Sequence, residues 1–445
     1  MKRTIFRHLA IALPITVLWV SSGASQTYYS VDNFKALTDS DSKDTIPPGT
    51  KITLHNWRGY RKFLPVWLQA AYSGHYHWKI GSDPDYTITV GPTHHYALPK
   101  KFQEDTEKYL GQTQLVKLPE EGSYTVKGYT AGQPFPNPTE PDLGPKLLYN
   151  HYYFYEPFVQ YFDDPDYVVD RYGNVAEQVG QDVLYRFTHL SEPGLPTNIP
   201  NTQGWFRTSY FTVISPEQSR YVTEMMLQKD DPAAGQEIFL FVPALRRSLR
   251  LSNAARCSPV LGLDYTNDDA ALMPTTFRTV FLGKKKVLER ISDGPKGHDI
   301  SAYLDPRTNP GVTFPAWPKD SGNSGHWELR DHYIVDLQKL ASFGQYCFPH
   351  RVYYLDSESY IAMYKEEYDR GGQLQKFVWA MEQPVRVHDE RVLTFWGFSG
   401  NPIVDFQNGH STYHVSDGRF DEDVPKEYQN YKEFAFPDAL SRVMK

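Results

Sequence analysis

The sequence of 445 residues lacks several features that would assign it to a common class of proteins. Basic residues are not in excess, because 53 Asp and Glu stand against 46 Lys and Arg. After residue 25, no stretch approaches the roughly 18 consecutive apolar residues typical of a membrane-spanning helix. We therefore expect a soluble mature chain with no nucleic-acid partner, since acidic chains are repelled by phosphate backbones.

Sequence motifs that carry catalysis are also missing. The chain has no H-E-x-x-H, no phosphate-binding P-loop and no G-x-G-x-x-G. The stretch GFSGN at 397–401 is not a nucleophile elbow, because its second glycine directly follows Ser399. The four histidines between residues 75 and 95 lack the tight spacing with acidic residues that metal sites need. We predict no catalytic motif, metal or cofactor, although folding could still assemble a carboxylate pair.

The first 25 residues have the order of a secretory signal peptide. Three basic residues in MKRTIFRH precede the apolar core LAIALPITVLWV and the small residues of SSGASQ. Residues 1–25 are therefore predicted to be a signal peptide cleaved after Ala24 or Ser25, and an uncleaved anchor is the alternative. Cleavage would move the formal net charge from -7 to -10 and leave a periplasmic protein.

Cysteine is scarce, with Cys257 and Cys347 as the complete set. In an oxidising compartment a single pair favours a disulfide bond, whereas two buried thiols are the alternative. We predict a bond between Cys257 and Cys347 that ties two loops of the sheet.

Aromatic residues, in contrast, are abundant at 15% of the chain. Aromatic side chains favour strands and line apolar cavities. With 33 prolines and 30 glycines to end these strands, the composition predicts a mainly β protein with many turns.

The region 26–157 mixes helices and loops. Three helices are predicted, at 55–74 with a kink or break at Pro65, at 99–112 starting at Pro99, and at about 142–153. We expect this region to pack on the following domain, residues 158–445, as one structural unit.

That second region is a series of strands with short connections, which predicts an antiparallel meander. The expected strands lie at 167–178 (a hairpin), 181–190, 204–215, 219–229, 237–243, 277–291, 326–338, 350–369, 374–387 and 401–416, with a short helix after Pro437.

Many segments in the same order resemble a proteobacterial secreted family of unknown function, labelled outer-membrane lipoprotein-sorting protein. The matching segments are 56–79 (NWRGYRKFLPVWLQAAYSGHYHWK), 129–138, 142–150, 239–251 (FLFVPALRRSLRL), 277–288, 326–337, 351–376 and 436–442. The resemblance implies the fold of the lipoprotein carriers LolA and LolB, a half-open antiparallel β-barrel around an apolar cavity with helices as a lid.

The stretch EIFLFVPALRRSLRL at 237–251 supplies candidates for the cavity lining. Beyond Pro243, alternate side chains place Leu245, Arg247 and Leu249 on one face, so a charge interrupts an apolar row. Arg247 could form a salt bridge, anchor a lid carbonyl or a lipid head group, or face outward. The candidate lining residues are Phe239, Phe241, Leu245, Arg247, Leu249 and Tyr354. Which face of each strand lines the cavity stays open, because a shift of one residue turns every side chain to the other face.

Two classes of function remain. The first is a periplasmic carrier that shields a lipid, an acyl chain of a lipoprotein or another hydrophobic ligand, with an envelope transporter or outer-membrane protein as a possible partner. The second is a periplasmic hydrolase with an aromatic-lined cleft, and a non-catalytic accessory of a transport complex is a further alternative. The absence of catalytic motifs and the resemblance favour the carrier over an enzyme.

Overall fold

The computed structural model describes most of the chain after residue 26. The described residues are 27–445 without 74–86, 252–255, 292–311, 314–316, 319–325, 344–346, 381–382, 395–398, 421–430, 432–435, 443–445 and the single positions 173, 201, 258, 271 and 389. The predicted signal peptide lies outside the described residues.

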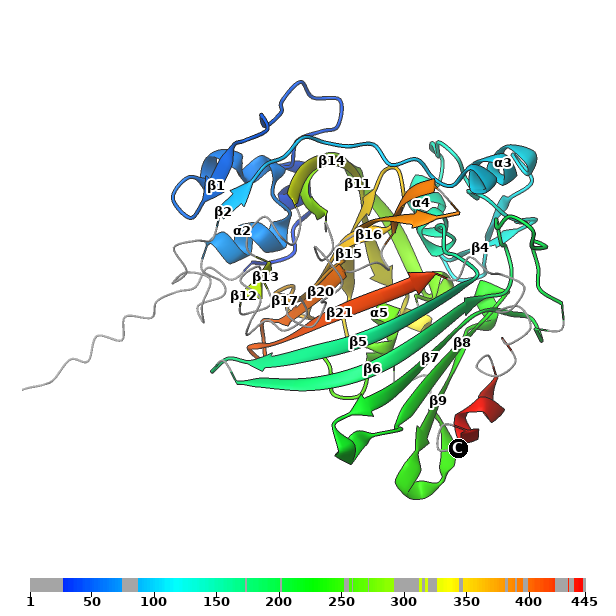
Figure 1. The fold of residues 1–445 in the computed structure, drawn as a ribbon. Helices are drawn as coiled ribbons and strands as arrows, with labels where there is room; N and C mark the ends of the chain where they lie inside the picture. Colours follow the sequence, from blue (N-terminus) through cyan, green and yellow to red (C-terminus); the bar gives the residue numbers. More distant parts are fainter. Residues whose placement is uncertain are drawn as a thin grey trace, which may run out of the picture.

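One antiparallel sheet of 13 strands dominates the fold (Figure 1). Its spatial order is β10-β9-β8-β7-β6-β5-β21-β20-β17-β16-β15-β14-β11. The strands are β5 Val159–Asp170, β6 Val175–Arg186, β7 Trp205–Ser215, β8 Thr223–Lys229, β9 Gln236–Val242, β10 Arg247–Leu251, β11 Phe277–Ile291, β14 His326–Lys339, β15 His350–Asp356, β16 Ala362–Tyr368, β17 Leu374–Trp379, β20 Ser399–Asp405 and β21 His410–Phe420.

Two meanders build this sheet. The first runs from β5 to β10, the second runs from β11 to β21, and the pairing of β21 with β5 joins them. Because β10 and β11 each have only one neighbour in the sheet, the barrel stays open between them. The predicted half-open antiparallel barrel is confirmed.

Four two-stranded sheets and several short helices complete the described structure. The small sheets pair β1 Lys51–Thr53 with β2 Thr87–Thr89, β3 Gln114–Lys117 with β4 Tyr124–Lys127, β12 Val312–Thr313 with β13 Trp317–Pro318, and β18 Gln383–Val387 with β19 Glu390–Thr394. The α-helices are α1 Val31–Lys35, α2 Val66–Tyr72, α3 Lys100–Lys108, α4 Leu143–Tyr152 and α5 Asn267–Ala270. The 3₁₀ helices are η1 Trp57–Phe63, η3 Glu217–Ser219, η4 Pro232–Ala234, η5 Pro243–Leu245, η7 Pro274–Thr276, η8 Ala341–Phe343 and η9 Pro437–Arg442.

Proline sets the helix boundaries that the sequence predicted. Pro65 lies between η1 and α2, so the apolar run at 55–74 forms two short helices instead of one. Pro99 occupies the N-cap position of α3, where its missing N–H costs no helical hydrogen bond.

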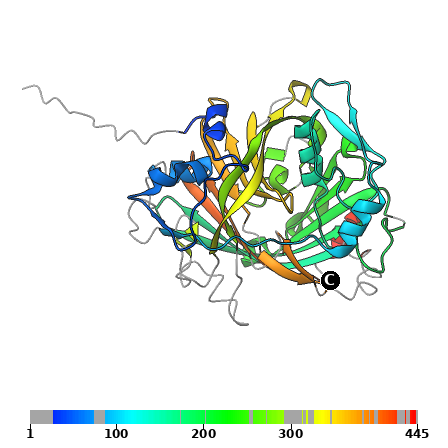
Figure 2. The same ribbon diagram turned by 90° about the horizontal axis from the view of Figure 1, so that it is seen from above.

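The two faces of the large sheet carry different elements. Seen from above, the sheet curls around α4 and α5, and α1 and α2 lie outside it (Figure 2). We call the face that bears α4 and α5 the inner face. On this face Leu147 and Leu148 of α4 pack against Val335, Leu337 and Tyr353.

The N-terminal region covers the outer face of β14 to β17. Trp67 of α2 is fully buried and stacks on Phe377 with ring centroids 4.1 Å apart. Trp379 and Tyr364 pack beside it in the same core cluster. Burial of an aromatic side chain of this size stabilises the attachment by roughly 3 kcal/mol, so this region is an integral part of the fold.

A disulfide bond joins Cys257 to Cys347, as the sequence predicted, across a separation of 90 residues. The bond links the segment that precedes α5 with the loop that leads into β15. It therefore anchors one end of the segment that lies over the inner face.

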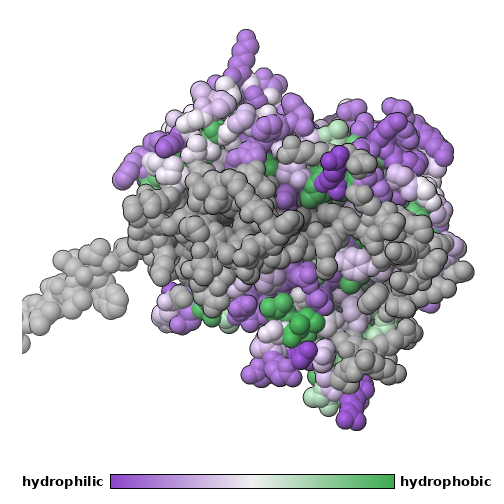
Figure 3. Space-filling model, viewed as in Figure 1, coloured by the Kyte–Doolittle hydropathy of each residue, from purple (hydrophilic) through white to green (hydrophobic). Residues whose placement is uncertain are grey.

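Among the residues coloured in Figure 3, most are hydrophilic, and apolar residues form a few separate patches. The large apolar residues that the described part of the chain exposes lie on separate elements: Tyr28, Val31, Leu110, Tyr172, Leu245 and Phe343. None of the described helices has the length and hydrophobicity needed to cross a bilayer. A ligand site for an apolar molecule is therefore expected inside the fold rather than on this surface.

Candidate ligand-binding cavity

A cavity opens on the inner face across β6, β7 and β8. Its volume is about 100 Å³, or about 930 Å³ when the open solvent at its mouth is included. The floor is the sheet, and the segment 260–265 forms the opposite wall. The lining residues are Glu156, Asp182, Leu184, Arg207, Thr208, Ser209, Phe211, Glu224, Met226, Gln228, Val260, Leu263, Tyr265 and His414.

The apolar part of the lining comes from both sides. Leu184, Phe211 and Met226 project from the sheet, and Val260 and Leu263 face them from the covering segment. A space with apolar walls and a few polar groups is the usual form of a small-molecule site.

Gly180 of β6 gives the Phe211 ring its place in this wall. A Cβ atom at position 180 would lie 2.3 Å from two ring carbons of Phe211, which is far inside van der Waals contact. Only glycine therefore accommodates the aromatic ring in this position without a shift.

The covering segment is fixed by buried ion pairs. Asp268 and Asp269 of α5 both bind Arg351 of β15, at 2.9 Å and 2.5 Å from its guanidinium nitrogens. Lys376 of β17 contacts Asp269 at 2.8 Å. Since each buried charge here has an opposite partner, these pairs hold α5 on the sheet and are structural in character.

One end of the cavity is acidic. Asp182 of β6 pairs with Phe211 of β7, which in turn pairs with Glu224 of β8, so the three side chains share one row of the inner face. Ser209 Oγ donates a hydrogen bond to Asp182 Oδ1 at 3.2 Å. Burial raises the pKa of Asp182 to about 6, although the hydrogen bond from Ser209 opposes this.

Glu224 differs from the other acidic side chains of the lining. The residue is 7% exposed, and its carboxyl group has no hydrogen-bond or ionic partner among the described residues. Burial, with a further contribution from the charge of Asp182, raises the pKa of Glu224 to about 7. At neutral pH this carboxyl group is therefore poised between its neutral and its ionised form.

The opposite end of the cavity carries a basic residue, Arg207, whose charge and hydrogen-bond donors have partners within the protein. The guanidinium of Arg207 contacts Glu156 at 3.2 Å, and its Nε donates a hydrogen bond to Gln228 Oε1. Gln228 in turn donates to the backbone carbonyl of Leu272 at 3.2 Å. Arg207 is thus held in place and its charge is compensated.

His414 of β21 lies at the side of the acidic end. Its Nδ1 is 2.6 Å from Asp166 Oδ1, and Asp164 lies 3.9 Å from its Nε2. Burial alone would lower the pKa of His414, but the charges of Asp166 and Asp164 outweigh it and raise the pKa to about 9. His414 is therefore charged at neutral pH and already paired.

The candidate lining residues from the sequence are not brought together. Phe239 and Phe241 lie on the outer face, where they pack in the cluster that contains Tyr431 and Leu440 of the C-terminal segment. Tyr354 also lies on the outer face, where its hydroxyl donates to Glu366 at 3.0 Å. None of these three lies among the residues that line the cavity.

The segment that follows β9 is an edge hairpin. Pro243–Leu245 forms a 3₁₀ turn in which Leu245 is 51% exposed, and β10 then folds back on β9. Leu249 lies opposite Leu240, on the row of Glu224 but two strands beyond the cavity. Arg247 is exposed on this edge strand and forms no ion pair with the described residues.

Sequence reasoning missed the polar residues of the cavity, namely Glu156, Asp182, Arg207, Glu224, Gln228 and His414. A signal was present in β8, where TEMMLQK places Glu224, Met226 and Gln228 at alternate positions, and hence on one face. An acidic residue and an amide in a strand whose burial is almost complete indicate a polar site rather than a solvent-exposed face.

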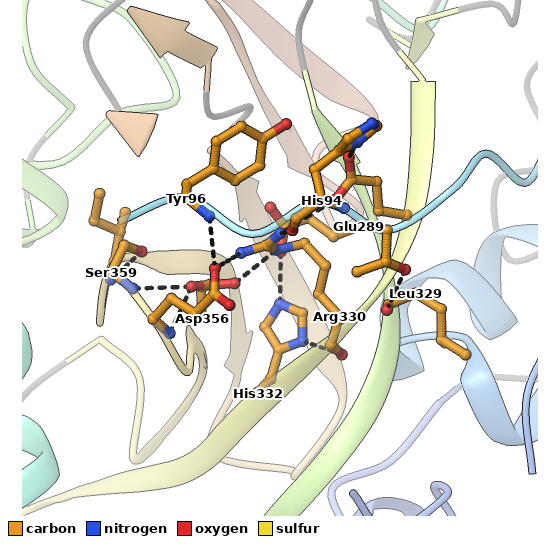
Figure 4. A network of polar contacts seen from close by, with 12 residues as sticks. His94, Tyr96, Glu289, Leu329, Arg330, His332, Asp356 and Ser359 are labelled. Atoms are coloured by element: carbon orange, nitrogen blue, oxygen red, sulfur yellow. Dashed lines mark hydrogen bonds and ion pairs between the residues drawn. The ribbon is translucent and has the colours of Figure 1, made fainter. Parts of the chain in front are cut away.

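A second polar cluster lies on the outer face around Arg330 of β14 (Figure 4). Its guanidinium contacts Asp356 at 2.8 Å, Glu328 at 3.1 Å and Glu358 at 3.0 Å. It also donates a hydrogen bond to the carbonyl of His94 at 2.7 Å. The cluster thereby ties the segment after β2 to the sheet.

Two groups of side chains in the described residues have donor atoms within 4.8 Å of one another, as a metal site requires. They are His94 with His326 and Glu328, and Glu289 with His332 and Asp356. In the first group both imidazoles approach Glu328 Oε1, at 2.6 Å and 2.8 Å, and Arg330 binds its other oxygen. These contacts satisfy the carboxylate without an ion, and the absence of a metal stays a prediction.

Comparison with known proteins places the chain in a family. A family model described as a protein of unknown function, DUF1329, matches residues 52–441. The chain belongs to this family. The family resemblance predicted from the sequence is thereby confirmed. A search of curated proteins found no match for this DUF1329 protein.

Three solved structures are similar to this DUF1329 protein. An outer membrane lipoprotein-sorting protein domain from Vibrio parahaemolyticus has 13% identity and a TM-score of 0.46, covering 68% of this chain and 99% of its own. A DUF1329 protein from Desulfovibrio piger has 12% identity and a TM-score of 0.45, covering 66% and 100%. The LolA superfamily protein NE2245 from Nitrosomonas europaea has 12% identity and a TM-score of 0.37, covering 64% and 96%. At these scores the likenesses carry no conclusion about the ligand.

Proposed function

We propose that this DUF1329 protein is a periplasmic carrier that binds a lipid, an acyl chain or a similar amphiphile in the cavity of its inner face, without catalysis. The observation that carries the proposal is the apolar wall formed by Leu184, Phe211, Met226, Val260 and Leu263. Moving an alkyl chain from water into such a space is favourable by about 0.8 kcal/mol for each buried methylene.

The cover of the cavity supports the same function. The wall opposite the sheet is a short segment that the ion pairs of α5 fix in place, and the cavity is partly open to solvent. A ligand can therefore enter without unfolding of the sheet.

The predicted export of the chain supplies the setting. A carrier that acts between two membranes needs a polar exterior and a sheltered apolar interior, and the signal peptide would deliver it to that compartment. We propose an envelope transporter, an outer-membrane protein or an acylated lipoprotein as the source or receiver of the ligand.

The test uses two matched leucine substitutions. Leu184→Asp places a charge in the cavity wall, and Leu245→Asp places the same charge on an exposed turn outside it. With a fluorescent fatty alcohol as the probe, we expect Leu184→Asp to weaken binding at least tenfold and Leu245→Asp to change it less than twofold. Circular dichroism checks that both variants fold.

Native mass spectrometry of protein prepared gently from the periplasm is the complementary measurement, and we expect a bound amphiphile. The proposal fails if no lipid co-purifies and no probe binds, or if both substitutions weaken binding equally. Turnover of a glycan or an ester by the purified protein would instead favour the hydrolase alternative.

A further inference from the structure

We infer that the polar end of the cavity's ligand is a protonated amine that is received between Glu224 and Asp182. The inference rests on the proposed function, because it assumes that the apolar walls hold the rest of an amphiphile. It selects one class of ligand, a cationic amphiphile, over fatty acids and other anionic lipids.

The first observation is the state of Glu224. Buried polar groups in proteins are nearly always hydrogen-bonded, and an unpaired buried carboxylate is costly. Glu224 lines the cavity at 7% exposure and yet has no partner among the described residues. A side chain kept in this position points to a partner that arrives with the ligand.

The second observation is the position of Asp182. Glu224 and Asp182 flank Phe211 on one row of the sheet, with their Cα atoms two strand spacings or roughly 10 Å apart. Both side chains point into the cavity. A compact donor group placed over the edge of the Phe211 ring can therefore reach both carboxyl groups.

The third observation is the shortage of available positive charge. Arg207 pairs with Gln228, four residues along β8 from Glu224 or roughly 13 Å, and is compensated by Glu156. His414 approaches from β21 and is compensated by Asp166 and Asp164. The polar side chain that the covering segment contributes to the lining is Tyr265. Its hydroxyl is neutral, because burial raises its pKa further above neutral pH.

The raised pKa values of Glu224 and Asp182 agree with this arrangement. Burial disfavours the ionised form of both carboxyl groups, and the charge of Asp182 adds to this effect at Glu224. An ammonium group would supply the missing charge and would favour ionisation of Glu224. An added carboxylate or phosphate would instead meet two acidic groups and no free cation in this part of the lining.

The inference predicts a coupling between binding and protonation. At a pH below its pKa of about 7, Glu224 is protonated and must release a proton before it can pair with an ammonium group. The affinity for an amine should therefore rise with pH. Between pH 6 and pH 8 the ionised fraction of such a group rises roughly tenfold, and the affinity for an amine should follow. A simple alkylamine stays protonated in this range because its pKa is near that of lysine.

The experiment compares three ligands with the same chain, dodecylamine, dodecanol and dodecanoate, by calorimetry below their aggregation concentrations. For the full mature chain at pH 8 we expect dodecylamine to bind at least tenfold more tightly than dodecanoate. Its affinity should fall about tenfold at pH 6. Binding at pH 6 should release a proton, which appears as a dependence of the heat on the ionisation enthalpy of the buffer.

Glu224→Gln tests the residue itself, and Glu237→Gln on β9 is its matched control. Glu237 lies outside the cavity lining and pairs with Arg250 at 3.3 Å. Glu224→Gln should weaken dodecylamine binding at least tenfold and remove the dependence on pH, while it leaves dodecanol within twofold. Glu237→Gln should change neither ligand, which controls for attraction of the amine to an acidic protein.

The outcomes separate this inference from the proposed function. If dodecanol binds but dodecylamine binds no more tightly than dodecanoate, the inference is wrong and the carrier proposal stands. The same holds if dodecylamine binds more tightly than dodecanoate to the wild type and equally so to Glu224→Gln. If none of the three ligands binds, the carrier proposal fails, and the inference fails with it.

Discussion

Replacement of Arg330 by methionine should strongly destabilise the protein, because one guanidinium compensates several buried carboxylates. Arg330 is 3% exposed and binds Glu328, Asp356 and Glu358 at 3.1 Å or less. Methionine fills a similar volume but carries neither the charge nor the hydrogen-bond donors. Glu328 and Asp356 would remain buried, with 0% and 1% exposure, and without their cation.

The size of the effect follows from this burial. Removal of one partner from a buried ion pair costs about 3–5 kcal/mol, because the other charge stays desolvated. Glu328 keeps its contacts with His94 and His326, and Asp356 keeps hydrogen bonds from the backbone N–H groups of Glu358 and Ser359. We therefore expect the free energy of unfolding to fall by about 3 kcal/mol in total, and not by this amount for each broken pair.

Urea denaturation followed by tryptophan fluorescence measures this loss. The control is Arg220→Met, which removes an exposed pair with Glu217 at 3.3 Å and should cost less than about 1 kcal/mol. Equal losses in the two variants would show that the Arg330 cluster contributes no more than a surface ion pair, and the reasoning would be refuted.

The same comparison should depend on pH. Burial would raise the pKa of Glu328, but hydrogen bonds with His326 and His94 and the charge of Arg330 lower it to about 2. A carboxyl group with a lowered pKa stabilises the fold above its unfolded value of about 4.3 and loses this contribution as the pH falls. The difference between wild type and Arg330→Met should therefore be full at pH 7 and begin to narrow below about pH 4.3. A difference that widens in acid would contradict the proposed pairing.

Three further predictions concern the attachment of the N-terminal region, the disulfide bond and export. Trp67→Ala should lower the free energy of unfolding by about 3–5 kcal/mol in the same denaturation assay, since it empties a fully buried site against Phe377. Reduction of the Cys257–Cys347 bond, which closes a separation of 90 residues, should cost up to about 4.6 kcal/mol, measured by denaturation with and without reductant. N-terminal sequencing of periplasmic protein should show a chain that starts directly after Ala24 or Ser25, whereas an intact Met1 would contradict the signal peptide.

The positions of most strands could be predicted from the sequence because local signals mark them. The expected strands at 350–369 and 401–416 instead each contain two strands, β15 with β16 and β20 with β21. β11 occupies 277–291 as expected, since β-branched and aromatic residues favour strands and a proline precedes it at 274. Pro65 and Pro99 fixed helix boundaries for a covalent reason, the missing N–H and the restricted φ. Such features act over a few residues, so they can be recognised without knowledge of the tertiary fold.

The sequence did not show which face of each strand lines the cavity, because other elements cover both faces of the sheet. In β16, AMYKEEY, all seven residues are buried, although Lys365, Glu366 and Glu367 would indicate solvent by composition. Glu366 lies under α2, where it accepts a hydrogen bond from the backbone N–H of Trp67 at 2.8 Å, and Glu367 lies on the inner face. Alternation in such strands marks two buried surfaces and does not tell which one lines a cavity.

The location of the cavity follows from where this covering stops. On the inner face of β16, Glu367 meets Arg351 at 2.6 Å and Lys376 at 3.0 Å, and α5 lies over these charges. Glu224 of β8 lies on the same face of the same sheet, but the segment 260–265 stands off from it and leaves a space. One carboxylate is compensated by the fold, and the other has no partner among the described residues. The contrast assigns the stabilising part of the inner face to the second meander and the proposed binding part mainly to the first.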